Sequence, residues 1–360
     1  MIESSPLAQF IASFTSGETS PVLIMAIAVV VHSALLVFPL ALASAYLDRK
    51  LGADVQMRIG PNRVGPVGIL QSLADTLKAI AKQDVVPSDY ARFFFKMGPF
   101  LALALVFAAS GPIPFAQSWA LSDLEWGSLY SVLMLLLVQL VLFLAGHSSG
   151  SHWAIIGAYR SILVLASFAV PALLALLSVV VIAGGASFSK IIAAQGGAPW
   201  RWLVFNHPPT ILAFFVMASS LALWNLSQPF DTPLAGSEIS GGISAEYSGF
   251  RLACLRALRH CQTVVSCALL ATLFLGGWNV QLPAETFGRA SNLIQYLVFV
   301  SKIGSLAVVG AWFRWSMVRL RGDQIIYHAW KILVPMGVLS VALSAVWMTV
   351  TGGKGFLGIP

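Results

Sequence analysis

Charged residues are scarce in this chain of 360 residues: Asp, Glu, Lys and Arg make up 10% of it, whereas hydrophobic residues make up 58%. A water-soluble domain usually carries about 25% charged residues, so the composition excludes an ordinary soluble enzyme. The apolar residues fall in blocks of about 20, a length that crosses a bilayer and far exceeds a barrel strand of roughly ten residues. The sequence therefore predicts an all-α polytopic membrane protein.

Cysteine and the common catalytic motifs are also rare or missing. The three cysteines form no Cys-x-x-Cys pair and cannot supply the four thiolates of an iron–sulfur cluster. The chain has no P-loop, no H-E-x-x-H and no G-x-S-x-G motif. We therefore expect no metal, flavin, haem or iron–sulfur cluster in this chain. We attribute the net charge of +7 to membrane topology and not to nucleic acid.

Eight apolar segments are expected to span the membrane, with an additional amphipathic helix at its surface. The segments are residues 22–46, 96–115, 129–147, 154–183, 211–227, 261–281, 293–313 and 331–350. No Lys or Arg precedes Arg49, so the first segment lacks the positive region of a secretory signal and is expected to stay as a span. Cations gather in alternate loops, which predicts that both chain ends lie on the outer side. We treat residues 1–360 as one membrane domain.

Two of the expected inside loops, residues 47–95 and 228–260, are longer than a simple transporter needs. The first contains QMRIGPNRVGP, residues 56–66, whose glycines and prolines fix turns. Arg58 and Arg63 in this string suit a docking surface or the mouth of a cavity. An ordinary basic loop facing anionic lipid is the alternative.

Residues 67–83 have the pattern of an amphipathic helix. Leu73, Leu77 and Ile80 recur at helical spacing, while Asp75 and Lys78 fall on other faces. Such a helix is too polar to span and is expected to lie in the cytoplasmic interface. There it would gate the lateral access of a lipid-soluble ligand, pack against another subunit, or do both.

Ionisable residues near a membrane cavity are candidates for binding protons or the polar groups of a ligand. The second inside loop carries Asp231, Glu238 and Glu246. The structural alternative is that these acids pin the loop to Arg58, Arg63 or Arg251. Lys302 lies within the seventh expected span, where we expect it to pair with an acid, to line a polar cavity, or to snorkel to the membrane surface.

The string QMRIGPNRVGPVGILQSLADTLKAIAKQDVVP, residues 56–87, closely resembles the first cytoplasmic loop of the quinone-site membrane subunit of NADH-quinone oxidoreductase, which is respiratory complex I. Similar motifs follow in the family's order: GAYRS at 157–161, PFD at 229–231, EYSG at 246–249, ATLFLGGW at 271–278, VRLRGDQ at 318–324 and AWKILVP at 329–335. The resemblance implies an eight-helix subunit that clamps the foot of the peripheral arm. Its quinone chamber would open to the membrane near the first span and the amphipathic helix.

The resemblance further implies a subunit of a multisubunit enzyme in a bacterial inner membrane, which takes part in coupling quinone reduction to proton translocation. Its partners would be quinone as substrate, the bilayer and the other membrane-arm and peripheral-arm subunits, whose iron–sulfur clusters deliver electrons. The residues expected at the quinone chamber and docking surface are Arg49, Lys50, Gln56, Arg58, Pro61, Asn62, Arg63, Phe230 and Asp231. The residues expected to form a proton or polar relay are Asp48, Asp75, Glu238, Glu246 and Lys302.

The chain departs from the family at several acidic positions that, in the family, form the polar chain taken to link quinone chemistry to proton translocation. Asp48 replaces a glutamate and keeps the charge. The other acids are replaced at Ala169 in the fourth span, within Leu223–Ser227 before the Pro-Phe-Asp motif, at Leu234 and Gly236 in the loop, and at Arg259. Neutral side chains and an arginine cannot relay protons at those sites.

Several interpretations of this pattern remain open. The chain is a divergent quinone-site subunit whose relay is rerouted through Glu238, Glu246 and Lys302, the equivalent subunit of a membrane-bound hydrogenase or other ion-pumping complex, or a non-pumping anchor of a peripheral oxidoreductase. An unrelated transporter is a further alternative. The intact loop at residues 56–66 favours the quinone enzyme.

Overall fold

The computed structural model describes residues 21–280 and 290–352, except residues 89 and 118. Within that part of the chain the regular structure is entirely helical. Seven of its helices are long and apolar enough to cross a membrane, and α10 (Pro208–Trp224) is a shorter apolar helix. These occupy the places of the eight expected spans, and the prediction of an all-α polytopic membrane fold is confirmed.

Five of the seven long spans are single α-helices. In the first and the last span, a π-helical turn joins two helical parts. The first span joins α2 (Pro21–His32) to α3 (Phe38–Val55) through η2 (Ser33–Val37). Five further spans are α5 (Arg92–Ser110), α6 (Gly127–His147), α7 (His152–Ala183), α12 (Gly249–Phe274) and α14 (Ala290–Ser316). The last joins α15 (Gly322–His328), η7 (Ala329–Leu333) and α16 (Val334–Thr351).

Two helices extend well beyond the apolar segments that identified them. Helix α3 continues to Val55, so that Asp48, Arg49 and Lys50 lie on a helix and not in the following loop. Helix α12 begins at Gly249, earlier than the expected start at residue 261. Hydropathy detects only the apolar part of a helix, whereas the backbone hydrogen bonds continue through charged residues until a turn-forming sequence ends them. The two irregular inside segments are correspondingly shorter than predicted.

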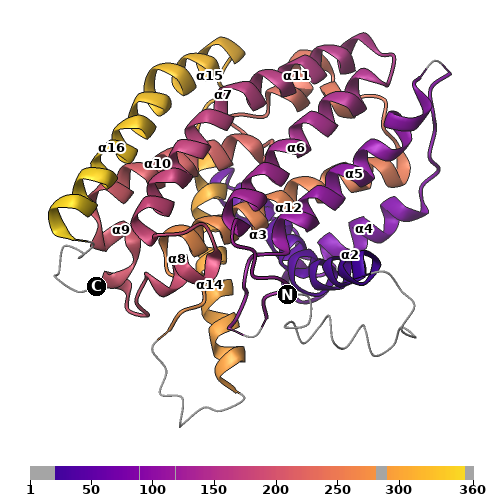
Figure 1. Ribbon diagram of the computed structural model, residues 1–360. Coiled ribbons are helices and arrows are strands. Elements are labelled where there is room, and N and C mark those ends of the chain that lie inside the picture. Colours follow the sequence, from indigo (N-terminus) through magenta and orange to yellow (C-terminus); the bar gives the residue numbers. More distant parts are fainter. Residues whose placement is uncertain (1–20, 89, 118, 281–289, 353–360) are drawn as a thin grey trace.

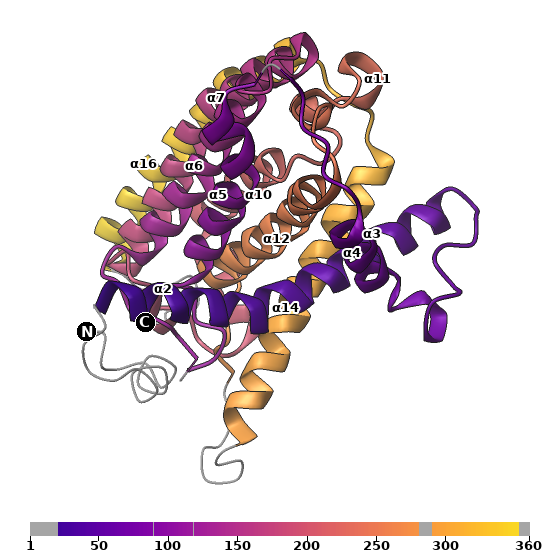
Figure 2. The ribbon, with the colours of Figure 1, turned by 90° about the vertical axis from the view of Figure 1, so that its right-hand side faces the viewer.

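The helices pack in two layers with α12 at the centre. Helices α5, α6, α7 and α16 lie side by side, and α10 packs against both α7 and α16 (Figure 1). Helix α12 packs against α5 and α10, and α3 and α14 pack against α12 and against each other (Figure 2). The apolar window of α12 is 78% buried, more than that of any other long helix described here. Its polar residues therefore face protein or cavities.

Small residues allow the closest approaches between elements. A Cβ atom added at Gly98 of α5 would lie 2.6 Å from the Cβ of Ala145 on α6. One added at Gly157 of α7 would lie 2.8 Å from the carbonyl oxygen of Pro233. Helix α5 thus packs tightly on α6, and the segment that holds η5 (Thr232–Leu234), α11 (Gly236–Ile239) and η6 (Gly242–Ser244) rests directly on α7.

The two long inside segments lie at the same end of the bundle and are bonded to each other. The Val85 N–H donates to Ser248 Oγ at 2.7 Å, and Ser248 Oγ donates to the Val85 carbonyl at 2.9 Å. Arg251 pairs with Asp84 at 3.1 Å. One of these segments carries η3 (Pro66–Gly68) and the amphipathic helix α4 (Gln71–Ala81), within the range predicted for it. The prediction that both chain ends are outside concerns residues 1–20 and 353–360, which are outside the described residues.

At the opposite end of the bundle, a fully buried glutamine holds the connection between α7 and α10 in place. This connection contains α8 (Phe188–Ala193), η4 (Pro199–Arg201) and α9 (Leu203–Asn206). Gln195 donates from Nε2 to the carbonyl oxygens of Thr272 at 3.0 Å and Leu273 at 3.2 Å. Its Oε1 accepts the Gly276 N–H at 2.6 Å. One side chain therefore fixes this connection to the end of α12.

We expect Gln195→Leu to lower the free energy of unfolding by at least about 2 kcal/mol, because each buried polar group left without a partner costs about 1–3 kcal/mol. Thermal denaturation of the purified protein in detergent measures this loss. Gln117→Leu is the matched control, since that residue is exposed. Equal melting temperatures for the two variants would contradict the assigned role.

Candidate functional site

A cavity of about 720 Å³ lies between α3, α4 and α12, beside the end of α14. Its volume is within the range of about 300–1,000 Å³ that is usual for small-molecule sites. Helix α4 packs against α3 and α12, and the end of α3 projects beyond them (Figure 2). We call this cavity the α4 cavity. The amphipathic helix therefore forms one wall of this cavity, and its role as a lateral gate stays a prediction.

The α4 cavity has an apolar wall and a charged wall. Phe38, Ala41 and Leu42 of α3 line one part of it. The charged part includes an ion pair between Arg49 of α3 and Asp75 of α4. This division suits a ligand with a polar head and an apolar tail.

Asp75 is held in its ionised form. Gln71 donates to it from Nε2 at 2.9 Å, and Arg49 donates to its other oxygen. Burial raises the pKa of this carboxyl, but the hydrogen bonds and positive charges around it outweigh burial and hold its pKa below the usual range. Asp75 therefore acts as a fixed anion at neutral pH.

Asp48 lies at the junction of this cavity with a second one. Its carboxylate pairs with Arg314 of α14 and accepts a hydrogen bond from Trp315 Nε1 at 3.1 Å. The side chains of Asp48 and Arg314 are only 13% and 16% exposed. Both residues line both cavities, as do Arg259 and His260 of α12. A charged cluster therefore separates the two spaces.

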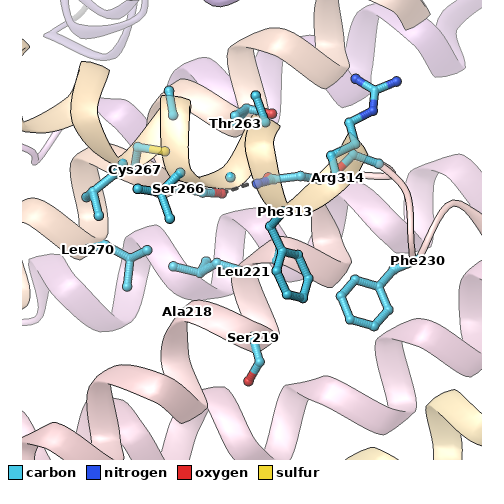
Figure 3. A pocket seen from close by; sticks show the side chains of 18 of the residues that line it. Ala218, Ser219, Leu221, Phe230, Thr263, Ser266, Cys267, Leu270, Phe313 and Arg314 are labelled. Carbon is cyan, nitrogen blue, oxygen red and sulfur yellow. Dashed lines mark hydrogen bonds between the residues drawn. The ribbon is translucent and has the colours of Figure 1, made fainter. Parts of the chain in front are cut away.

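The second cavity, of about 410 Å³, lies between α10, α12 and α14, and we call it the α10–α14 cavity. Figure 3 shows Thr263, Ser266 and Cys267 of α12 on one side of it and Ala218 and Ser219 of α10 on the other. Ser266 Oγ donates to Asn225 Oδ1 at 2.9 Å between two of its lining residues. This cavity was not predicted from the sequence.

The predicted chamber and docking residues divide into four groups. Arg49 lines the α4 cavity, whereas Phe230 lines the α10–α14 cavity. Asp231 lines neither and pairs with Arg319 at 2.9 Å. The remaining residues lie at the end of α3 or on the loop beyond it and line neither cavity: Lys50, Gln56, Arg58, Pro61, Asn62 and Arg63. Their docking role stays a prediction.

Only two of the five predicted relay residues, Asp48 and Asp75, are brought together, because both line the α4 cavity. Asp48 and Asp75 lie at the cavities, but Glu238 pairs with Arg160 on the surface, and Glu246 has no ion-pair partner among the described residues. Lys302 lies at the opposite end of α12, where its Nζ donates to the carbonyl oxygens of Leu275 at 2.7 Å and Gly277 at 2.8 Å. It therefore satisfies backbone acceptors there and has no acid partner in the described part of the chain.

The structural alternative, in which the loop acids pair with Arg58, Arg63 or Arg251, is wrong for Asp231 and Glu238, and Glu246 has no ion pair with any described residue. Asp231 and Glu238 instead pair with Arg319 and Arg160, and Arg251 pairs with Asp84. The physical reason is that the segment before α12 folds back over α7 and over the turn after α14. The loop at residues 56–66 projects away from it.

Glu238 offers a test of how little a surface pair contributes. The hydrogen bond from Arg160 holds its pKa below the usual range. Its stabilisation is therefore present above the unfolded pKa and is lost as the pH falls through the folded pKa. Both side chains are substantially exposed, so the pair contributes about 0–1 kcal/mol. We expect the melting temperatures of Glu238→Gln and the parent protein to differ slightly at pH 7 and to converge in acid. A decrease of more than about 2 kcal/mol in the free energy of unfolding at pH 7 would contradict this expectation.

Neutral side chains occupy the bundle interior near positions where the resemblance implies acids. Trp224, which lies in one of these segments, is fully buried. Gln139 of α6 donates to the Trp224 carbonyl at 2.9 Å, and Ser161 of α7 donates to Gln139 Oε1 at 3.0 Å. Gln139 is not recognisable as a site residue from the sequence, where its only signal is a single amide within an apolar span. These contacts are satisfied without an ionisable group.

The comparisons with known proteins agree with this architecture. Residues 25–345 match the family described as NADH dehydrogenase. A protein of Rubrobacter xylanophilus, named as the H subunit of NADH-quinone oxidoreductase, is 37% identical over 321 residues, which cover 88% of this chain and 92% of that protein. This chain belongs to that family. Proteins of the same name are 36% identical in Carboxydothermus hydrogenoformans (84% of this chain, 83% of that protein) and 34% identical in Caulobacter vibrioides (83% and 88%).

Family membership confirms the resemblance drawn from the loop at residues 56–87. The structure, in turn, brings to the cavities residues that sequence motifs did not assign to a site. Arg256 and Tyr247 line the α4 cavity, and Arg314 and Trp315 contact Asp48. Arg314 follows the seventh apolar segment, and no sequence signal connects it to Asp48.

Proposed function

We propose that this chain is a membrane subunit of an NADH-quinone oxidoreductase and that the α4 cavity is its part of the quinone chamber. The observation that carries this proposal is the construction of the cavity, with apolar α3 residues on one side and the Arg49–Asp75 pair on another. A membrane quinone has a polar head and an apolar tail, which match those two parts. Helix α4 would control its passage from the lipid.

Recognition of the quinone head follows from the donors at the charged part of the cavity. Arg256 lines it from α12 and is exposed, while Arg49 is held in place by Asp75. A guanidinium donates hydrogen bonds to a carbonyl oxygen and stabilises negative charge that develops on it during reduction. Reduction to quinol consumes two electrons and two protons. These residues would therefore bind and orient the head.

The docking surface for a peripheral subunit is proposed at the loop after α3. Met57 is 98% exposed and Ile59 is 85% exposed, with Arg58 between them. Apolar side chains that project singly into water are common, but two on a loop rich in fixed turns favour a protein contact. The three cysteines are free and separately buried. We infer that electrons reach the quinone from redox centres in the docked subunits.

One observation favours a second candidate function for the coupling role. Ala169, Trp224, Leu234 and Gly236 stand at or within the segments that carry acids in the family. A subunit that binds quinone without passing protons through its own bundle is the function these side chains support. The number of protons moved per NADH oxidised in proteoliposomes tests it. A ratio equal to that of a relative with the acids would favour coupling instead.

Co-purification tests the proposed assembly. The chain would be tagged, native membranes extracted gently, and its partners identified by mass spectrometry. Flavin-bearing and iron–sulfur-bearing NADH dehydrogenase subunits are the expected result. A nickel hydrogenase pair would instead assign the chain to hydrogen metabolism, and the chain alone would contradict the assembly.

We expect Glu246→Gln to lower quinone reductase activity without preventing assembly. Glu246 precedes Tyr247, which lines the α4 cavity, and it has no ion pair with any described residue, so its charge is free to act on the cavity. Activity per assembled complex is the measurement. Glu238→Gln is the control, because its carboxylate is engaged by Arg160. Unchanged turnover in Glu246→Gln would reduce this residue to a structural contact.

A further inference from the structure

The α10–α14 cavity opens sideways, toward the lipid. Phe215 of α10 and Val309 of α14 line it and are 59% and 60% exposed. Both helices have the apolar composition of membrane helices, so this opening faces the hydrocarbon. The α4 cavity, by contrast, is lined by α4 and has no residue from α10. The two spaces are reached from different directions.

Apolar side chains form the body of the α10–α14 cavity. Leu221, Leu270 and Leu306 line it from α10, α12 and α14, and Figure 3 shows Phe313 among them. Along α12 the lining runs from Arg259 to Leu270, which corresponds to about 16 Å of helix. This is about half of a hydrocarbon core that is about 30 Å thick. The cavity therefore has the depth of one leaflet.

The inner end of the cavity carries an excess of positive charge. Arg314 is paired with Asp48, but Arg259 has no salt bridge to any described residue, and its buried Nε lacks a hydrogen-bond partner. The two carboxylates whose charge reaches it, Asp48 and Asp231, are already paired with other arginines. A poorly solvated cation without a counter-ion is costly. The site is therefore complementary to an anion.

The charged end of the α10–α14 cavity lies near the surface of the membrane. Arg314 is two residues from the end of α14. That end of the bundle also holds the two long inside segments, because Leu320, just beyond α14, donates its N–H to the Pro229 carbonyl at 3.1 Å. A head group at Arg259 and Arg314 would thus lie near the aqueous interface, with its chain extending toward the bilayer centre.

We propose that the α10–α14 cavity binds one anionic phospholipid, with its phosphate at Arg259 and one acyl chain between α10 and α14. The cavity of about 410 Å³ is too small to enclose a transmembrane helix about 10 Å across and about 30 Å long, so a partner helix could only cover its opening. Its net positive charge favours an anionic head over a neutral quinone. This inference does not depend on the proposed quinone chamber.

Lipid retention tests the proposal on the assembled complex. The complex would be reconstituted in nanodiscs of phosphatidylcholine and phosphatidylglycerol, washed in detergent, and its retained lipids quantified by mass spectrometry. We expect about one phosphatidylglycerol per chain in the parent protein and at least tenfold less after Arg259→Gln. Ala218→Phe, which fills the cavity without changing charge, should cause the same loss. Arg256→Gln is the control, because Arg256 does not line this cavity.

Three results would overturn the proposal. The first is equal retention of phosphatidylcholine and phosphatidylglycerol, and the second is retention unchanged by both Arg259→Gln and Ala218→Phe. The third is recovery of quinone in place of lipid, with the same two variants lowering it. Cross-linking with a photoactivatable phosphatidylglycerol tests the site in the parent protein, without any substitution. It should label α10 or α14 near Phe215 and Val309, and labelling elsewhere would count against the site.

Discussion

Asp48→Asn is expected to lower the free energy of unfolding by about 3–5 kcal/mol, the usual cost of breaking a poorly solvated ion pair. The substitution leaves Arg314 without its counter-ion while Arg259 already lacks one. Two positive charges would then face each other across the wall between the cavities. Thermal denaturation of the purified complex and its quinone reductase activity measure the two consequences, and we expect both to fall.

Arg49→Gln is the matched comparison for Asp48→Asn. It breaks the pair with Asp75, whose side chains are 45% and 36% exposed, and such exposed pairs contribute about 0–1 kcal/mol. Its effect on stability should therefore be small, even where it alters quinone binding. Similar losses of stability in the two variants would show that Asp48 and Arg314 are better solvated than the geometry indicates.

Ala79→Trp is expected to raise the apparent KM for quinone at least tenfold, which corresponds to about 1.4 kcal/mol of lost binding. Ala79 lies on α4 and lines the α4 cavity, so a large ring at this position would occupy the path of the quinone. Steady-state kinetics with a short-chain quinone is the measurement. The same preparation should transfer electrons from NADH to an artificial acceptor that does not use the quinone chamber.

Ala81→Trp is the control for Ala79→Trp. Ala81 is exposed at the end of the same helix and does not line the cavity. A KM close to that of the parent protein is expected, because the added ring would lie in solvent or lipid head groups. If both variants raised the KM equally, the effect would come from the helix as a whole and not from the cavity.

Much of the fold could be predicted because apolar length and charge position carry it. The eight expected segments correspond to helices, and the amphipathic pattern located α4. The ends of α3 and α12 could not be predicted in the same way. Helical hydrogen bonding continues past the last apolar residue, and the sequence marks only where the bilayer ends. Asp48 and Arg259 were consequently placed in loops.

The candidate site was less predictable because its contacts join distant parts of the chain. Asp48 was identified from the family motif, but its partner Arg314 is 266 residues away and belongs to no motif that was used. Lys302 was singled out because a cation within a span is costly, yet backbone carbonyl oxygens near Gly277 compensate its charge. Local patterns identify which residues need a partner, whereas the packing of helices determines which partner they obtain.

The charged cluster shared by the two cavities makes their occupants energetically reciprocal. Asp48 and Arg314 line both cavities. A ligand in one cavity that strengthens or weakens their ion pair therefore changes the electrostatic potential in the other cavity. Thermodynamic linkage requires that the factor by which the first ligand changes the affinity for the second equals the factor in the reverse direction. Cooperativity between membrane lipid and the ligand of the α4 cavity is thus measurable from either side, and Asp48→Asn should abolish it.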